Sequence, residues 1–145
     1  MTYRHRVAVV GGGIAGVSAA WALAAEHDVT LLEAGAQLGE HATGRSAAIL
    51  SETSGTRAVC ALARASRSFF ETPPPGFADH DVTGERGLLW IGRTGDESQL
   101  DAISAVAARG VAPTARRVDA GEARRLVPAL RPAAVTAGGF HEPDA

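Results

Sequence analysis

The sequence contains no lysine and no asparagine, and it has only one cysteine, Cys60. A single cysteine excludes an internal disulfide framework and a multi-cysteine metal site, and it favours a reducing, cytoplasmic location. Cys60 has no neighbour in the sequence that would activate it, so we expect a buried structural thiol. The 14 positive residues are all arginine, and the net charge is −2. This balance gives no indication of nucleic acid as a partner.

Support for metal or hydrolase chemistry is also missing. None of the five histidines has metal-ligand spacing to another histidine or to the cysteine, so we expect no metal site. No Ser-His-Asp order with a nucleophile elbow is present.

Arg4 and Arg6 precede 19 uncharged residues, 7–25, which imitate a secretory signal or a membrane span. Three consecutive glycines at 11–13 interrupt the apolar helix that either would need, so we expect no membrane span.

What the chain does have is a soluble globular composition, with 145 residues, 46% of them hydrophobic and 21% charged. A proline cluster in residues 72–76 ends a predicted helix and marks the best boundary in the chain. We therefore expect an N-terminal domain over residues 1–75 and the first part of a second domain over residues 76–145.

A short apolar strand at residues 7–10 runs into a glycine turn with G-x-G-x-x-G spacing. In this motif the first glycine permits the tight turn, the second lets a phosphate approach the backbone, and the third lets helix and strand pack closely. The amides at the start of the following helix then face the ligand, and the helix dipole adds about half a positive charge. The motif consists of Gly11, Gly13 and Gly16, and the helix begins with Ile14 and Ala15.

The residues after the turn fit a nucleotide-binding βαβ unit over residues 6–33. An apolar helix at 14–25 should pack on the strands through Ile14, Val17, Trp21 and Ala25, and a second strand follows at 29–33. Glu33 lies 20 residues after Gly13, where a dinucleotide site places an acid that binds the adenosine ribose. A plain glycine turn beside a surface glutamate is the alternative. We expect an α/β, Rossmann-like FAD/NAD(P)-binding fold.

Residues 34–56 are small and polar, which is typical of a ligand-facing loop with a short helix. Within it, Thr43-Gly44-Arg45-Ser46 supplies hydroxyls, a flexible backbone position and a guanidinium, the groups that a second phosphate contact would need. A solvated loop explains the same residues equally well at this point.

The remaining elements predict a mixed α+β region. A helix over residues 56–70 should bury Val59, Leu62, Ala63, Ser66, Phe69 and Phe70 and expose Arg57, Arg64 and Arg67. Strands are expected at 87–92, around 116–118 and at 135–140. Two further helices are expected after capping boxes, one with Asp96 and Gln99 and one with Asp119 and Glu122.

Taken together, the sequence resembles flavin-dependent oxidoreductases of the D-amino-acid oxidase, glycine oxidase and sarcosine oxidase group, and most of all D-amino-acid dehydrogenases of the D-arginine type. The similarity lies in residues 9–16, in Leu32-Glu33 and especially in His41-Ala42-Thr43-Gly44-Arg45-Ser46-Ala47-Ala48. Shorter similar stretches are residues 65–70, 74–77 and 126–130. The resemblance implies that the segment from Thr43 to Ala48 and the turn after Glu33, beginning at Ala34, contact FAD.

The resemblance also implies the chemistry, which is hydride transfer from an amine-bearing carbon to the flavin, with a small amine or amino acid as substrate. Glu52 is the nearest carboxylate that could meet a cationic substrate, with a solvent-facing side chain as the alternative. Members of the group have longer chains, so we expect this chain to be an N-terminal fragment whose catalytic residues remain unassigned. The alternatives are a non-catalytic fragment, a subunit of a split flavoprotein whose C-terminal half is a separate partner, and an NAD-dependent dehydrogenase.

Overall fold

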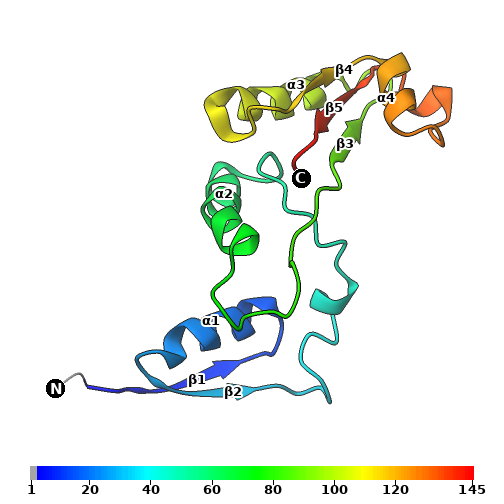
Figure 1. Cartoon of the computed structure of the whole chain (residues 1–145). Helices are drawn as coiled ribbons and strands as arrows, with labels where there is room; N and C mark the ends of the chain where they lie inside the picture. Colours follow the sequence, from blue (N-terminus) through cyan, green and yellow to red (C-terminus); the bar gives the residue numbers. More distant parts are fainter. Residues whose placement is uncertain (1–2) are drawn as a thin grey trace. The chain divides into compact units, whose positions relative to one another are not determined.

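The computed structural model describes residues 3–145 and divides into two compact units, Met1–Ala48 and Ile49–Ala145 (Figure 1). This division by contacts does not coincide with the domain boundary expected near residue 75, which stays a prediction. The helix before the proline cluster belongs to the second unit, and the reason is visible in its contacts, described below. Within residues 3–145, none of the helices combines the length and the apolar character needed to cross a bilayer.

The first unit is the βαβ unit expected from the sequence. Strand β1 spans Arg6–Val10, helix α1 spans Ile14–Ala24 and strand β2 spans Asp28–Leu32. The two strands are parallel, with Val7 paired to Val29 and Val10 to Leu32. A parallel pair needs a crossover, which α1 supplies by packing on both strands. This confirms the Rossmann-like α/β expectation.

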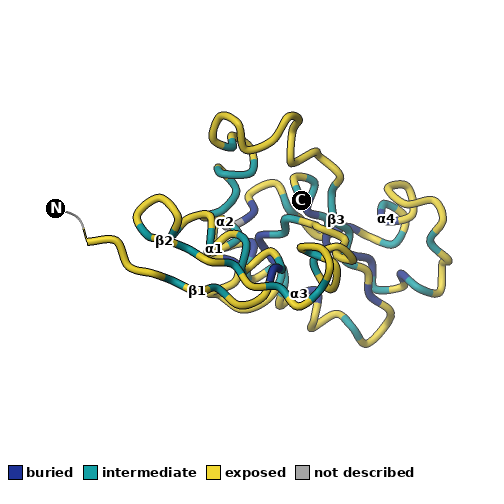
Figure 2. The backbone as a smooth tube through the Cα atoms, turned by 90° about the horizontal axis from the view of Figure 1, so that it is seen from below, coloured by how far each residue is buried: buried dark blue, intermediate teal, exposed yellow. Residues whose placement is uncertain are grey.

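The face that α1 turns toward the strands differs in part from the prediction. Val17 is half-buried as expected, together with Gly16 and Leu23. Ile14 and Trp21 are 65% and 55% exposed, and Ala25 is exposed as well. The helix is apolar on every side, so hydrophobic periodicity could not select a face. Instead, Gly16 allows the closest approach and so sets which residues turn inward. Figure 2 shows the resulting mixture of exposed and half-buried residues along β1, β2 and α1.

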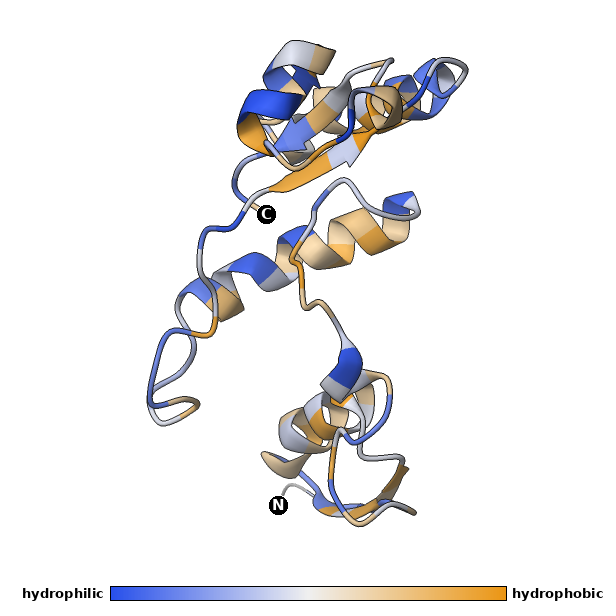
Figure 3. Ribbon diagram, turned by 90° about the vertical axis from the view of Figure 1, so that its right-hand side faces the viewer, coloured by the Kyte–Doolittle hydropathy of each residue, from blue (hydrophilic) through white to orange (hydrophobic). Residues whose placement is uncertain are grey.

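Helix α2, Arg57–Glu71, is the first helix of the second unit. It begins at Thr56, whose hydroxyl accepts a hydrogen bond from the Val59 amide at 3.4 Å. The predicted inner face is wrong for Leu62, which is 67% exposed, and Val59 is 50% exposed. Arg67, expected outside, is half-buried. Cys60 is buried, as expected, and Figure 3 shows how apolar and charged residues share the helix.

The second unit contains an antiparallel sheet in the order β3-β5-β4. Strand β3 spans Leu88–Ile91, β4 spans Arg116–Val118 and β5 spans Gly139–Glu142. The last strand starts later than expected, because Val135 closes a turn by accepting a hydrogen bond from the Gly138 amide. Gly138 has a φ of 75°, which glycine adopts without strain.

Two helices cover this sheet region, α3 at Glu97–Val106 and α4 at Ala120–Leu126. The capping box at the start of α4 is confirmed on its Asp119 side, since that carboxylate accepts from the Glu122 amide at 2.7 Å. The box expected at α3 is wrong, because Asp96 accepts instead from the Arg93 amide in the preceding turn. Short turns complete the element order, the 3-10 helix η1 at Thr43–Arg45, the π-turn η2 at Ala107–Val111 and the 3-10 helix η3 at Pro132–Ala134.

The hydrophobic core lies in the second unit and forms two clusters. Phe140, which is 1% exposed, joins Leu100 from α3 in one cluster, and Trp90 packs against them. The other cluster consists of Val118, Ala123 and Val135. Strand β5 therefore contributes the largest apolar side chain of the core.

Candidate functional site

The glycine turn after β1 is held by its own backbone. Gly11 has a φ of 101°, and its amide donates to the Leu32 carbonyl at 2.7 Å, which joins the turn to the end of β2. A side chain at Gly16 would overlap the Gly11 carbonyl oxygen, so the third glycine of the motif is required by the close approach of α1 to the turn. The expected roles of the first and third glycines in backbone geometry are thus visible in the structure.

The start of α1 presents amides that no other described residue uses. The first intrahelical bond runs from the Val17 amide to the Gly13 carbonyl. Within residues 3–145, the amides of Gly13, Ala15 and Gly16 have no hydrogen-bond acceptor, and the first turn of the helix holds no acidic side chain. Free amides at the positive end of a helix dipole are suited to bind an anionic group such as a phosphate.

Glu33 lies against the glycine turn. Its carboxylate accepts hydrogen bonds from the Gly12 amide at 2.6 Å and from the Gly35 amide at 2.7 Å. The bond from Gly35 comes first and that from Gly12 second among the causes that lower the pKa of the Glu33 carboxyl below its ordinary value. The side chain is therefore ionised and fixed beside the turn. Its role toward a ribose stays a prediction.

Gly12 is crowded, although the motif leaves its position open. A side chain there would meet Glu33 Oε2 at 2.9 Å and would overlap Leu38. The Gly12 amide already donates to Glu33, so it is not one of the free amides at the start of α1. The neighbouring glycines therefore differ in role, since Gly12 binds the Glu33 carboxylate and Gly13 keeps a free amide.

The structure brings Thr43 to the same place. Its hydroxyl oxygen accepts a hydrogen bond from the Ile14 amide at 2.9 Å. Two backbone bonds run alongside, from the Gly39 amide to the Gly12 carbonyl at 2.9 Å and from the Gly44 amide to the Gly39 carbonyl at 2.7 Å. Sequence reasoning missed Gly39, which has a φ of 71°. The only signal for it was a glycine within the polar loop.

The remaining predicted residues follow Thr43 along the chain. The Ser46 hydroxyl accepts from the Ala48 amide at 3.1 Å, and Ala48 has a φ of 52°, in the left-handed region. Arg45 and Ala47 are exposed. Ala34 follows Glu33 directly, and its backbone amide is a smaller cause that lowers the pKa of the Glu33 carboxyl. All the predicted binding residues belong to the first unit, and the structure joins Thr43 and Glu33 directly to the glycine turn.

These residues fit a dinucleotide on two grounds seen in the structure. Three unbonded amides share one helix start, where a pyrophosphate could bind, and a carboxylate after β2 is the kind of acceptor that a ribose hydroxyl needs. A pyrophosphate needs several donors at once, and backbone amides at a helix start supply them without a positive side chain.

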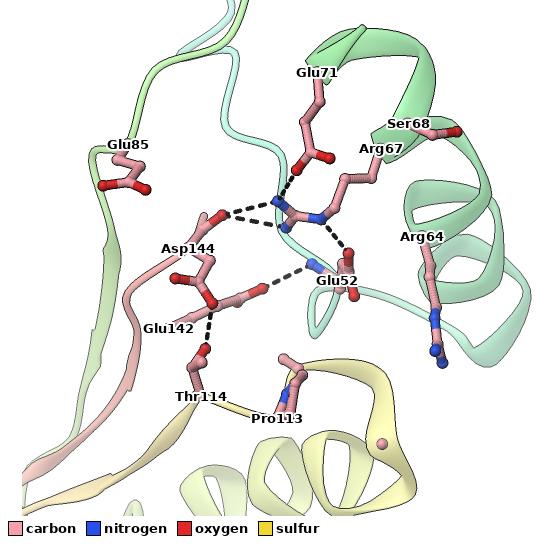
Figure 4. Close-up of a pocket in the computed structure, with 12 residues that line it drawn as sticks. Glu52, Arg64, Arg67, Ser68, Glu71, Glu85, Pro113, Thr114, Glu142 and Asp144 are labelled. Carbon is pink, nitrogen blue, oxygen red and sulfur yellow. Dashed lines mark hydrogen bonds and ion pairs between the residues drawn. The ribbon is translucent and has the colours of Figure 1, made fainter.

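The second unit contains a separate pocket of about 570 Å³, lined by α2, the π-turn region and the residues after β5 (Figure 4). Arg67 points into it and bonds to Glu52, to Glu71 at 3.2 Å and to the Asp144 carbonyl at 3.2 Å. The bond from Glu52 is the main cause that raises the pKa of Arg67 above its ordinary value. Glu52 is 5% exposed and already paired with this arginine, which leaves its suggested role toward a cationic substrate without structural support.

Glu142 also lines this pocket and is 1% exposed. Its carboxylate accepts from the Ser51 hydroxyl at 2.9 Å, the Thr53 hydroxyl at 2.7 Å and the Glu52 amide at 2.8 Å. Together, Arg67 and Glu142 fix residues 51–53 to α2 and β5, which explains why α2 belongs to the second unit. Within residues 3–145, no three side chains of the metal-ligating types come close enough to hold a metal ion.

One comparison with known proteins bears on the whole chain. Residues 6–145 match the model of the family described as FAD dependent oxidoreductase (DAO). The matched range includes the glycine turn, Glu33, the Thr43–Ala48 segment and all of the second unit.

Proposed function

The chain belongs to the FAD-dependent oxidoreductase family, and from this membership we propose that it is the amine or D-amino-acid type, which removes hydride from an amine-bearing carbon. The cofactor of the family, FAD, is the one expected from the sequence. The substrate type rests on the resemblance of residues 41–48 to D-amino-acid dehydrogenases and related oxidases. The product would be an imine, which water hydrolyses to a carbonyl compound and an amine or ammonia.

Bound FAD would supply the electron-pair acceptor of the reaction, and the protein would supply binding and orientation. The amides of Gly13, Ala15 and Gly16 would hold the pyrophosphate, since they are free and share one helix start. Glu33 would accept hydrogen bonds from the adenosine ribose, and as an ionised group it would repel a 2′-phosphate.

The single observation that supports the proposed cofactor site is the geometry at the start of α1. A carboxylate fixed by two amides, Gly12 and Gly35, stands beside the three free amides of the helix. The same arrangement, considered alone, would also suit NAD, which was the alternative expected from the glycine motif. Family membership favours FAD. Arg45 and Ser46 are proposed to steady the phosphate and flavin end.

The direct test is a reconstitution. Purified protein is incubated with excess FAD, passed through a gel-filtration column and scanned for bound flavin absorbance, with NADH titrated in parallel. Flavin that elutes with the wild-type protein and is lost in Gly16→Ala supports the site. Colourless wild-type protein would remove FAD binding from the proposal, and tighter binding of NADH would favour a dehydrogenase.

The substrate type has its own test. Anaerobic mixing of the flavin-loaded protein with D-amino acids, secondary amines and 2-hydroxy acids should bleach the flavin only with the nitrogen compounds. Bleaching by hydroxy acids alone would contradict an amine-oxidising function, while leaving FAD binding intact.

A second candidate function is a subunit that needs a partner chain to complete its sheet. The outward residues Val10 and Leu32 of β1 and β2 are 83% and 50% exposed, although parallel sheets are ordinarily covered on both faces. A partner chain that packs on this face would bury them. Stoichiometric FAD uptake and substrate bleaching by the purified chain alone would argue against this candidate.

We also propose a cytoplasmic location, supported by the lone cysteine.

A further inference from the structure

The Thr43 hydroxyl occupies a position that the glycine motif does not specify. It accepts the hydrogen bond of the Ile14 amide, the first amide of α1, at 2.9 Å. A side chain at Gly13 would lie 3.3 Å from the same oxygen, so the absence of a Cβ there gives the hydroxyl its room. Thr43 therefore takes up the Ile14 amide, which lies between the free amides of Gly13 and Ala15.

The backbone holds Thr43 in this position through an independent chain of contacts. Gly39 donates to the Gly12 carbonyl and accepts from the Gly44 amide. A Cβ at Gly44 would lie 2.6 Å from the Gly39 carbonyl oxygen, closer than real side chains come. The segment carrying Thr43 is thus pinned to the glycine turn by the backbone and to α1 by the hydroxyl.

The chemistry of a hydroxyl decides what this contact can do. A threonine hydroxyl has one proton to donate and two lone pairs to accept with. The bond from Ile14 uses a lone pair, and no described residue accepts the proton of Thr43. An anionic oxygen at the helix start would find this proton beside the free amides of Gly13 and Ala15.

Resting on the proposed FAD binding, we propose that Thr43 is a positioning residue that clamps the Thr43–Ala48 segment to the start of α1. In this contact the Ile14 amide donates to Thr43 and is no longer available to a ligand. The Thr43 hydroxyl proton takes its place as a donor to a phosphate oxygen. Both cofactor-binding segments of the first unit then form one preorganised cradle before the cofactor arrives, which lowers the ordering cost of binding.

Three variants of the full chain test the clamp. Thr43→Val keeps the shape and removes the hydroxyl, and Thr43→Ser restores it. Thr56→Val is the matched control, because Thr56 caps α2 with the same kind of hydroxyl-to-amide bond and lies outside the proposed FAD site. Each variant is measured for FAD dissociation constant by flavin fluorescence, for melting temperature without FAD, and for hydrogen exchange at the Ile14 amide.

We expect Thr43→Val to weaken FAD binding about tenfold, the equivalent of one hydrogen bond. Thr43→Ser should return to wild-type affinity, and Thr56→Val should lower the melting temperature while leaving affinity unchanged. In the absence of FAD, the Ile14 amide should exchange faster in Thr43→Val than in wild type.

The outcomes separate the two proposals. Unchanged affinity in Thr43→Val, or failure of Thr43→Ser to restore a lost affinity, would overturn the clamp while FAD binding stands. Unchanged exchange at Ile14 would overturn it without any cofactor in the experiment. If wild-type protein takes up no FAD, the proposed function fails, and the clamp as a cofactor-positioning device falls with it even where Ile14 is protected.

Discussion

Replacing Arg67 with methionine should destabilise the second unit, because it leaves the carboxylate of Glu52 buried without its partner. The Glu52 side chain is 7% exposed, and its ion pair to Arg67 is the shortest contact of the guanidinium. The same substitution also removes the bonds to Glu71 and to the Asp144 carbonyl. Methionine keeps the length and apolar stem of the arginine, so the charge and the hydrogen bonds are what is lost.

The size of the effect follows from burial. Removing one partner of a fully buried ion pair costs about 3–5 kcal/mol. The Arg67 side chain is 26% exposed and lines an open pocket, so we expect a cost below that range, about 2–3 kcal/mol. The pair with Glu71, whose side chain is 52% exposed, should add only a few tenths, roughly 0.3 kcal/mol.

The assay is urea unfolding followed by tryptophan fluorescence in a Trp21→Phe background. This background leaves Trp90 of β3 as the only tryptophan, so the signal reports the second unit alone. Arg64→Met is the matched control on the same helix, since Arg64 is exposed and none of the described residues pairs with it. The double variant Glu52→Gln/Arg67→Met measures the coupling between the two charges.

We expect a clear midpoint shift for Arg67→Met, almost none for Arg64→Met, and a double variant that is more stable than the sum of its single changes. Equal effects of the two arginine substitutions would refute the buried pair as a source of stability. Strict additivity of the Glu52 and Arg67 changes would show that the two side chains do not interact in solution.

Three further predictions concern other parts of the chain. Gly16→Ala should abolish FAD uptake and lower the melting temperature, as seen by gel filtration and circular dichroism, because its Cβ overlaps the Gly11 carbonyl. Because the pKa of Glu33 is lowered in the folded state, its ionised form stabilises the fold at every pH above the pKa of the unfolded chain, and this stability is lost as the pH falls through the lowered pKa. The hydrogen bonds of Glu33 should therefore persist at neutral pH and be lost only below the ordinary carboxyl range. Amide exchange at Gly12, followed from pH 7 downward, tests this. Phe140→Ala should cost about 3–5 kcal/mol in urea unfolding, because Phe140 is 1% exposed in the main core cluster.

The βαβ unit could be predicted because its determinants are local. The strand, the glycine spacing and Glu33 lie within residues 6–33, and each has a backbone reason that holds in any sequence context. The same is true of Asp119, which caps α4 through the Glu122 amide three residues later. A local pattern fails where a nearer donor competes, as at α3, where the Arg93 amide binds the Asp96 carboxylate in place of the expected cap.

Helix faces were predicted less well, for two different reasons. In α1 nearly every residue is apolar or small, so periodicity carries no direction, and the closeness allowed by Gly16 decides the packing instead. In α2 the apolar stripe does carry a direction, but a buried acid outweighs it. Glu52 draws Arg67 inward, and Leu62 is left 67% exposed.

The contacts that organise both units were hidden because they join residues far apart in the sequence. Thr43 reaches Ile14 across 29 positions, and Glu142 reaches the Glu52 amide across 90. Neither side chain has a local pattern that distinguishes it from a solvated loop residue, since a hydroxyl or carboxylate becomes interior only when donors from elsewhere satisfy it. For Thr43 the donor is the helix start that the glycine motif already predicts. Polar loop residues near such a motif therefore need to be judged by the amides that the motif leaves free, because those amides supply the missing partner.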